Sequence, residues 1–303
     1  MSFKICQAMS VALLLLWGTV APNAVSATPV KVVEVNGVQL QYVEKGSGEP
    51  IVFVHGAVSD LRAWESISDR IAENHRFIAY TQRYFGTEPW KDDGKEFSVA
   101  THANDLAQFL STLKIGPVHL VGWSYGGTVA TVAAVQNPSL IRSLILYEPP
   151  LTTMLSPDSP EGKKAIAERN KLFGPVVQAA RAGDHVGAAK LLVERVLQLP
   201  SGGFDREPQS RQTIRLDNAR SVPLLFSSPP PPSITCDMLK SFTAPTLLLV
   251  GEKTEAFFPI VIQGYERCMP GAEKVVLSNV NHDGPIRDPD GFSAAVLSFV
   301  EMQ

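Results

Sequence analysis

One stretch near the middle of the chain restricts the fold more than any other. The apolar run 118–121 leads into Gly122-Trp123-Ser124-Tyr125-Gly126-Gly127, and a segment rich in alanine and valine follows. A strand that turns into a helix within about one residue forces that residue into a strained backbone conformation. The positions two before and two after it then approach too closely for a β-carbon, which favours glycine at both. The stretch therefore predicts a buried strand, a tight turn at Ser124 and a helix.

The same residues also suggest chemistry. Gly122 to Gly126 match Gly-x-Ser-x-Gly, a pattern that lifts a serine above a sheet as a nucleophile. The helix begins at Tyr125, so free backbone N–H groups and the positive helix end lie beside Ser124. A serine in an ordinary glycine-rich turn is the alternative interpretation. The strand and helix on either side favour Ser124 as a nucleophile.

The first 27 residues have the pattern of a secretion signal. Lys4 precedes a mostly apolar run over 11–20, and Ala24-Val25-Ser26-Ala27 supplies the small residues that a signal peptidase reads. The apolar run is shorter than the ~20 residues that a membrane-spanning helix needs. We therefore expect cleavage after Ala27, no stable membrane insertion afterwards, and a periplasmic or secreted protein.

Length and charge place further bounds on the chain. Of the 303 residues, cleavage leaves 276, enough for one α/β domain with an insertion. The chain has 27 basic and 30 acidic side chains, and only Lys4 is lost, so the net charge changes from −3 to −4. This balance gives no reason to expect nucleic acid as a partner. Cys236 and Cys268 remain; they could pair in an oxidising compartment or stay as buried thiols.

Short apolar runs alternate with helix-like segments, which predicts β–α–β units and a doubly wound, mostly parallel sheet. Two further strands, 30–35 and 39–45, flank the tight-turn signal Asn36-Gly37. We expect eight strands in all. The six others are the runs 51–54, 77–80, 118–121, 144–147, 246–250 and 274–277.

The alternation stops after Glu148-Pro149-Pro150. From there to the proline run 229–232 the chain contains charged, helix-like segments and no buried strand, so we expect a helical lid inserted into an α/β core. The core is then formed by 28–150 and 234–303, the lid by 151–233, and the lid helices by 161–182, 184–198 and 206–226.

A late histidine completes the pattern. His282 lies in Val280-Asn281-His282-Asp283-Gly284, directly after the last expected strand. With the serine motif and the loop His55-Gly56, it makes the chain resemble the α/β-hydrolase superfamily from about Val38 to Phe299. In that family a histidine takes the proton of the serine nucleophile, and the chain order is nucleophile, acid, histidine. The resemblance thus implies that His282 is the base for Ser124.

The resemblance also implies an oxyanion hole and a substrate pocket. Two backbone N–H groups, those of Tyr125 and Ala57, take the oxyanion positions, and His55 is expected to order the Ala57 loop. The lid is expected to cover Ser124. Trp123, Phe257 and Phe258 are candidates for lining the pocket, with plain core packing as the alternative.

The acid departs from the family pattern. The family usually has Gly-Glu-x-Asp after the strand 246–250, whereas this chain has Gly251-Glu252-Lys253-Thr254, and threonine cannot carry the charge. Glu148 follows the strand 144–147, where some members carry their acid, and its apolar surroundings suggest a fixed carboxylate. Glu255 is one residue too late and would need a shifted loop. We favour Glu148, then Glu255, then a serine–histidine pair without an acid.

A serine nucleophile attacks acyl carbon, so the expected function is hydrolysis of a small carboxylic ester, thioester or lactone. The same scaffold resembles carbon–carbon bond hydrolases and cofactor-free perhydrolases, which is a second interpretation. A third is a catalytically silent binding protein, which the missing aspartate favours and the intact Ser124 and His282 oppose. The sequence contains no dinucleotide-type glycine loop and no metal-ligand spacing, so no cofactor and no metal are expected.

Overall fold

The structure, a computed structural model, describes Met1 and residues 28–303. The secretion signal expected over residues 1–27 therefore lies, apart from Met1, outside the described residues. Within the described part, no helix has both the length and the apolar character needed to cross a membrane.

Eight strands form one sheet in the order β1-β2-β4-β3-β5-β6-β7-β8. The first two pairings, β1 with β2 and β2 with β4, are antiparallel, and all the others are parallel. The expected fold class, a mostly parallel eight-stranded sheet with helices on both sides, is confirmed. The strands are β1 Lys31–Val35, β2 Val38–Lys45, β3 Pro50–Val54, β4 Arg76–Tyr80, β5 Val118–Trp123, β6 Ile141–Tyr147, β7 Thr246–Gly251 and β8 Glu273–Leu277.

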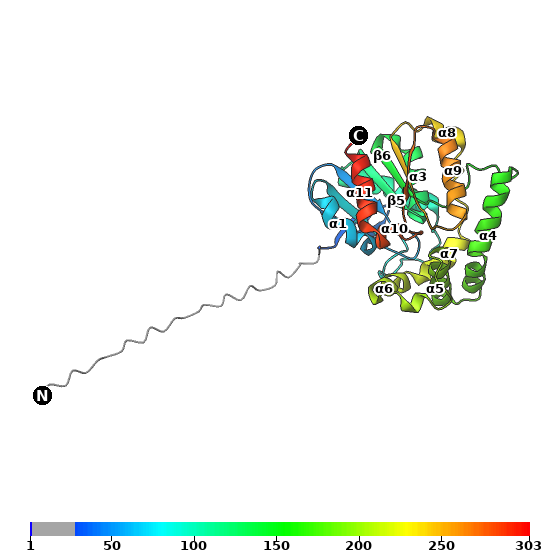
Figure 1. The fold of residues 1–303 in the computed structure, drawn as a ribbon, viewed down its shortest axis with the longest axis horizontal. Helices are drawn as coiled ribbons and strands as arrows, with labels where there is room; N and C mark the ends of the chain where they lie inside the picture. Colours follow the sequence, from blue (N-terminus) through cyan, green and yellow to red (C-terminus); the bar gives the residue numbers. More distant parts are fainter. Residues whose placement is uncertain (2–27) are drawn as a thin grey trace.

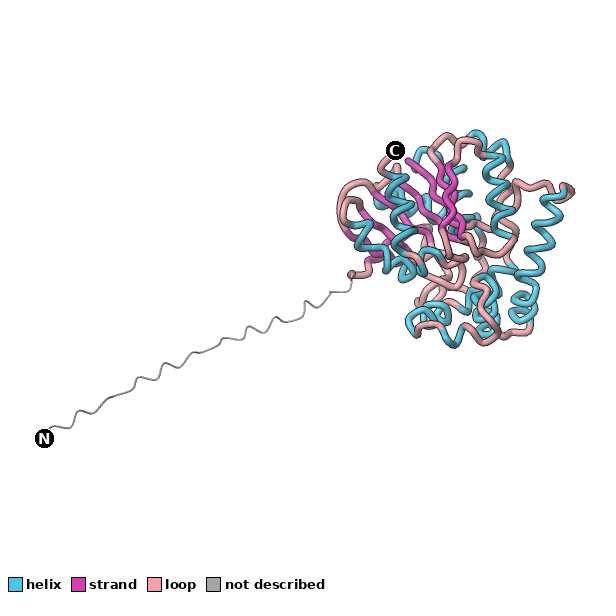
Figure 2. Tube along the Cα trace, in the orientation of Figure 1, coloured by secondary structure: helices cyan, strands magenta, loops and turns pink. Residues whose placement is uncertain are grey.

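Helices cover both faces of the sheet (Figures 1 and 2). Helices α1 and α11 pack against each other on one face, and α2, α3 and α9 cover the other. The core helices are α1 Glu65–Ala72, α2 Val99–Leu113, α3 Tyr125–Gln136, α8 Cys236–Ser241, α9 Phe257–Cys268, α10 Gly284–Arg287 and α11 Pro289–Val300.

The alternation of side chains along each strand builds two apolar layers. Along β3, Ile51 and Phe53 join the layer under α1 and α11, while Val52 and Val54 join the layer under α2, α3 and α9. All four side chains are fully buried. The central strands are therefore apolar on both faces, as strands in the middle of a parallel sheet must be.

The segment between β6 and β7 forms a group of helices beside the sheet (Figure 1). Its helices are α4 Pro160–Arg181, α5 His185–Val196, α6 Gln209–Asp217 and α7 Val222–Ser227. They share a separate apolar cluster, which also includes Val58 of the core. The two ends of the segment meet, because the Thr153 hydroxyl accepts a hydrogen bond from the Ile234 N–H (3.1 Å) and donates to its carbonyl (3.0 Å).

One expected lid helix is wrong in detail. The single helix predicted over 206–226 is broken: α6 ends at Asp217, a short 3₁₀ turn follows, and α7 begins at Val222. The break lies at Asn218, whose fully buried side chain turns toward the core. Its carbonyl oxygen accepts from the Gly86 N–H (2.6 Å), and its amide donates to the Asp60 carboxylate (2.7 Å). These contacts hold Asn218 against the core, whereas a continuous helix would direct the following residues away from the core.

The two cysteines left open by the sequence form a disulfide. Cys236, the first residue of α8, bonds to Cys268, the last residue of α9. The bond fixes the point at which the chain returns from the lid to the core.

Candidate active site

Ser124 lies at the turn between β5 and α3 with φ 53° and ψ −120°, a strained conformation for a residue other than glycine. The flanking glycines are required by close contacts. A β-carbon on Gly122 would lie 2.7 Å from the Gly127 Cα, and one on Gly126 would lie 2.3 Å from the Val54 carbonyl oxygen. The turn thus has the strand–turn–helix geometry expected from the sequence.

The structure brings Ser124, His282 and Glu148 into one hydrogen-bonded chain. His282 Nε2 lies 2.8 Å from Ser124 Oγ, and His282 Nδ1 lies 2.5 Å from Glu148 Oε2. An ionised carboxylate can only accept, so Nδ1 carries the imidazole proton and Nε2 accepts from the serine hydroxyl. The serine proton therefore points at a nitrogen that can take it.

Glu148 reaches His282 from the end of β6. Its backbone is left-handed (φ 48°) and its side chain is fully buried. Oε1 accepts from the Gly251 N–H (2.8 Å), and Oε2 accepts from the Thr254 hydroxyl (2.9 Å). The carboxylate is thus held by the end of β7, the strand after which the family usually places its aspartate.

Glu255 takes no part in this arrangement. Within residues 28–303, no hydrogen bond connects its carboxylate to His282. Thr254 occupies the position at which the family usually has its aspartate. Its hydroxyl donates to the Glu148 carboxylate.

Aromatic side chains hold the His282 ring and its backbone. Phe258 stacks on the imidazole, with centroids 4.0 Å apart and planes inclined by 15°. The Trp123 indole N–H donates to the His282 carbonyl (2.8 Å). Phe257 and Phe258 were candidates for lining the pocket, but both are buried beside the cavity and are not among its lining residues. They begin α9, whose buried side turns them toward His282 and Phe173.

A cavity of about 540 Å³ opens onto Ser124 and His282. Its walls are mostly apolar, and Trp123 is one of them, as expected. The lid contributes Phe173 from α4, Leu192 from α5 and the proline run that begins at Pro229. Among the residues that the structure describes, Arg169 and Arg215, both from the lid, are the lining side chains with a permanent charge. The cavity therefore suits an apolar molecule with room for an anionic group.

The two segments expected to form the oxyanion hole lie on either side of Ser124. Ala57 and Tyr125 both line the cavity, and a β-carbon on Gly56 would lie 3.3 Å from the Ser124 Cβ. Within the described part of the chain, neither backbone N–H donates to another protein group. Both donors are available to an oxygen bound beside Ser124.

His55 orders the Ala57 loop from below. Its Nδ1 faces the Gly56 carbonyl (2.8 Å), which only accepts, so Nδ1 carries the proton and Nε2 accepts from the Gln82 N–H (3.0 Å). Burial lowers the pKa of His55 to about 4. His55 is therefore neutral at pH 7, and its ring connects the Gly56 carbonyl with the Gln82 N–H.

A similar histidine lies under Tyr125. His102 donates from Nε2 to the Arg83 carbonyl (3.0 Å) and accepts at Nδ1 from the Tyr125 hydroxyl (2.7 Å). Burial lowers the pKa of His102 to about 3 and raises that of the Tyr125 phenol. The first residue of α3 is thus fixed by its side chain, while its N–H remains available.

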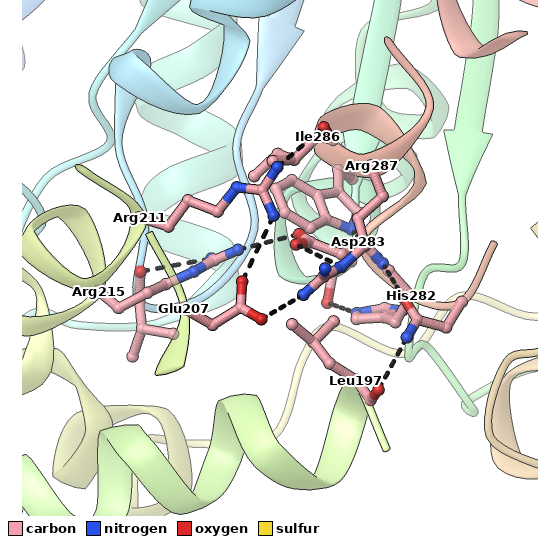
Figure 3. Close-up of polar contacts among 12 residues, drawn as sticks. Leu197, Glu207, Arg211, Arg215, His282, Asp283, Ile286 and Arg287 are labelled. Carbon is pink, nitrogen blue, oxygen red and sulfur yellow. Dashed lines mark hydrogen bonds and ion pairs between the residues drawn. The ribbon is translucent and has the colours of Figure 1, made fainter. Parts of the chain in front are cut away.

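Two features of the site carry no signal in the sequence. One is the presence of Arg215 at the site, and the other is the contact that Asp283 makes with it. Asp283 follows His282 but points away from its ring, toward Arg215 of α6 (3.1 Å; Figure 3). No local pattern could have found this pair, because its members lie 68 residues apart and belong to the lid and the core. Within the described residues, no three His, Cys, Asp or Glu side chains are grouped as a metal site.

Comparison with known proteins relates this geometry to a family. The family model described as the alpha/beta hydrolase fold matches residues 49–289. A 2-(acetamidomethylene)succinate hydrolase from Mesorhizobium japonicum is 24% identical over 89% of this chain and 94% of its own length. A pimeloyl-[acyl-carrier protein] methyl ester esterase from Vibrio vulnificus is 25% identical over 86% of this chain and 97% of its own.

Solved structures share the fold. A thermophilic esterase from Thermogutta terrifontis has a TM-score of 0.70 and 23% identity, and covers 90% of this chain and 98% of its own. An enol-lactonase from Burkholderia xenovorans has a TM-score of 0.69 and 20% identity, with 89% and 100% covered. From the sheet order and the matching family model, we conclude that this chain belongs to the α/β-hydrolase fold family.

Proposed function

We propose that the protein is an exported serine hydrolase that cleaves a small carboxylic ester, thioester or lactone through an acyl-enzyme on Ser124. The observation that carries the proposal is the hydrogen-bonded chain Ser124–His282–Glu148, which ends at an apolar cavity. The relatives named above as a hydrolase and an esterase support the reaction class.

The proposed reaction has two halves. His282 Nε2 takes the Ser124 proton as Oγ attacks the acyl carbon, and the oxygen that becomes negative accepts from the N–H groups of Ala57 and Tyr125. The protonated His282 then gives its proton to the departing alcohol, thiol or lactone oxygen. In the second half a water molecule attacks the acyl carbon and loses a proton to His282, which returns that proton to Ser124 Oγ as the bond to Oγ breaks and the acid leaves. Glu148 keeps the imidazole oriented and stabilises its positive charge in both halves.

Export rests on the signal pattern and on the disulfide. Disulfides persist in oxidising compartments and are rare in the cytosol, so the Cys236–Cys268 bond supports a periplasmic or secreted location. Mass spectrometry of protein secreted by an expressing bacterium should give a chain that begins at Thr28. A full-length chain that starts at Met1 in the cytosolic fraction would contradict export.

The first test is hydrolysis of p-nitrophenyl esters of increasing acyl length. We expect turnover by the purified protein and its loss in Ser124→Ala. Ser228→Ala is the matched control, because Ser228 lines the same cavity, while the His282 ring has its hydrogen bonds with Ser124 and Glu148. Reaction with a fluorophosphonate, followed by mass spectrometry, should label Ser124.

Two other interpretations predict different results. A carbon–carbon bond hydrolase or a perhydrolase would be labelled at Ser124 but would turn over simple esters poorly. A catalytically silent binding protein would neither turn over esters nor be labelled, and that result would overturn the proposal.

A further inference from the structure

We propose that Arg215, on helix α6 of the lid, is a positioning residue that holds the loop of Ala57 and the loop of His282 in their working arrangement. The inference rests on the function proposed above. Arg215 neither donates to the reacting atoms nor belongs to the serine–histidine–glutamate chain.

Arg215 contacts three separate parts of the site. Its Nη2 donates to the Asp283 carboxylate (3.1 Å), the residue next to His282. Its Nη1 lies 3.5 Å from the carbonyl oxygens of Ala57 and Val58, in the segment that supplies one oxyanion N–H. The guanidinium also lies 5.3 Å from the ring centroid of Trp123, the residue before Ser124.

Both members of the ion pair are removed from water. Arg215 is 8% exposed and Asp283 is 1% exposed. Burial raises the pKa of Asp283, while Arg215 and the neighbouring arginines Arg287 and Arg211 oppose that rise. Burying a charged pair gains little stability over an apolar pair of the same shape, so stability alone does not explain its presence. Its position between the two loops suggests a structural task at the site.

Three neighbouring charged side chains, Glu207, Arg211 and Arg287, form a second set of ion pairs next to the Arg215–Asp283 pair (Figure 3). Glu207 accepts from Arg287 (2.6 Å) and from Arg211 (3.4 Å), and Arg287 lies 3.9 Å from Asp283. Arg211 is one turn before Arg215 on the same helix, yet its contacts are with Glu207 and the Ile286 carbonyl. Only Arg215 of these three arginines reaches the Ala57–Val58 segment.

Val58 explains why that segment needs an outside support. It is β-branched and has φ 46°, in the left-handed region that such residues rarely adopt. Conformations of this kind persist only where the surroundings impose them. The side chain of Val58 is buried in the lid's apolar cluster, and its carbonyl faces Arg215. The lid therefore holds the strained residue next to Ala57 by both its side chain and its backbone.

A guanidinium is suited to this task because it presents several N–H donors in one rigid plane, whereas an ammonium is a compact point charge on a flexible stem. Arg215→Lys should keep the ion pair with Asp283 and the fold, but lose the simultaneous contact with the two carbonyls. Arg215→Ala should lose both.

The test compares Arg215→Ala and Arg215→Lys with Arg211→Ala and Arg211→Lys. For a neutral p-nitrophenyl ester we expect kcat and the rate of fluorophosphonate labelling to fall about 100-fold in Arg215→Ala, because small misplacements of reacting groups have effects of that size. KM should change little, and millimolar guanidinium chloride, against a sodium chloride control, should restore part of the rate. Arg215→Lys should be impaired at unchanged thermal stability, and both Arg211 variants should resemble the unaltered protein.

Hydrogen exchange gives a readout that does not depend on activity. In Arg215→Ala, backbone amides of the segments 55–60 and 280–287 should exchange about tenfold faster together, while those of α3 keep their protection. Unchanged exchange in both segments overturns the inference. So does an equal loss of rate in Arg211→Ala, or a loss confined to the KM of esters with a free carboxylate, which would make Arg215 a substrate-binding residue. An unlabelled, inactive wild-type protein with the expected exchange result would overturn the proposed function and leave this inference standing.

Discussion

The hydroxyl of Thr254 donates a 2.9 Å hydrogen bond to Glu148 Oε2, the same oxygen that lies 2.5 Å from His282 Nδ1. Thr254 occupies the position after β7 at which the family usually has an aspartate. In this chain the carboxylate that contacts His282 comes from the end of β6, and the residue at the usual position donates to it. Two strand ends that lie side by side in the sheet therefore share the task of orienting His282.

Glu148→Gln should lower kcat by about 10⁴-fold, the loss seen when the acid of such a triad becomes an amide. The fold should persist, because the glutamine oxygen can still accept from the Gly251 N–H. Steady-state kinetics and circular dichroism check both parts. Glu255→Gln is the matched control; full activity in Glu148→Gln with loss in Glu255→Gln would assign the acid to Glu255.

Thr254→Val should lower kcat about tenfold, because a hydrogen bond to a charged group contributes about 1.5–3 kcal/mol and the carboxylate loses one of its fixed donors. Thr254→Asp should recover part of the activity of Glu148→Gln, since it returns a carboxylate to the end of β7. The double variant is measured beside each single one. A double variant no better than Glu148→Gln would show that position 254 cannot reach His282.

Replacing both Cys236 and Cys268 with alanine should lower the free energy of unfolding by about 3–4 kcal/mol, because the disulfide closes a loop with a sequence separation of 32. Urea denaturation measures the difference. The value of kcat should hardly change, since the bond lies at the end of α9 away from Phe258. Titration of the unfolded, unreduced protein after signal cleavage should find no free thiol, and two thiols per chain would contradict the disulfide.

Two of the buried histidines, His55 and His102, should make the protein less stable in mild acid. The pKa of His55 is lowered from 6.5 to about 4 and that of His102 from 6.5 to about 3. Each therefore contributes stability that is present above pH 6.5 and is lost as the pH falls through the lowered pKa, because the unfolded chain takes up the proton first.

For His55 the loss reaches about 3 kcal/mol near pH 4. Urea denaturation between pH 7 and pH 4.5 should show a falling free energy of unfolding, with a shallower slope in His55→Gln and in His102→Gln. His185→Gln is the control, because His185 is exposed. A slope that is the same in all three variants would remove the buried histidines as its cause.

Arg169, one of the two lid arginines at the cavity wall, should favour substrates with a negative charge. Esters that end in a carboxylate should have a higher kcat/KM than neutral esters of the same length. In Arg169→Glu that preference should fall about tenfold in low salt, as expected for reversing a partly exposed charge. Arg181→Glu, on the same helix and outside the cavity lining, is the control. An unchanged preference would rule out Arg169 as its source.

Local sequence signals were enough to place most of the fold. The apolar runs correspond to the strands, the glycines around Ser124 correspond to close contacts, and His282 follows the last strand. These features depend on residues close together in the chain, where periodicity and steric limits act directly. The prediction of Glu148 over Glu255 depends on the family resemblance, in which some members carry their acid after this strand, and on the apolar and proline residues around Glu148.

The features that the sequence could not reveal depend on contacts between distant segments. Asn218 ends α6 because Gly86 and Asp60 bind its side chain, and nothing in 206–226 signals that partner. Phe258 stacks on His282 rather than lining the cavity because α9 turns its buried face inward. Arg215 looks like any other charged lid residue until α6 is packed against the core.

The order of the strands has a consequence for biosynthesis. Ser124 and Glu148 follow the neighbouring strands β5 and β6, but His282 lies 134 residues beyond Glu148, after β8, and is therefore made later in translation. Under the proposed mechanism a nascent or truncated chain holds the nucleophile and the acid without the base. The protein therefore stays chemically silent until the loop of His282 has been made and folded, and labelling of Ser124 detects only molecules that have passed this stage.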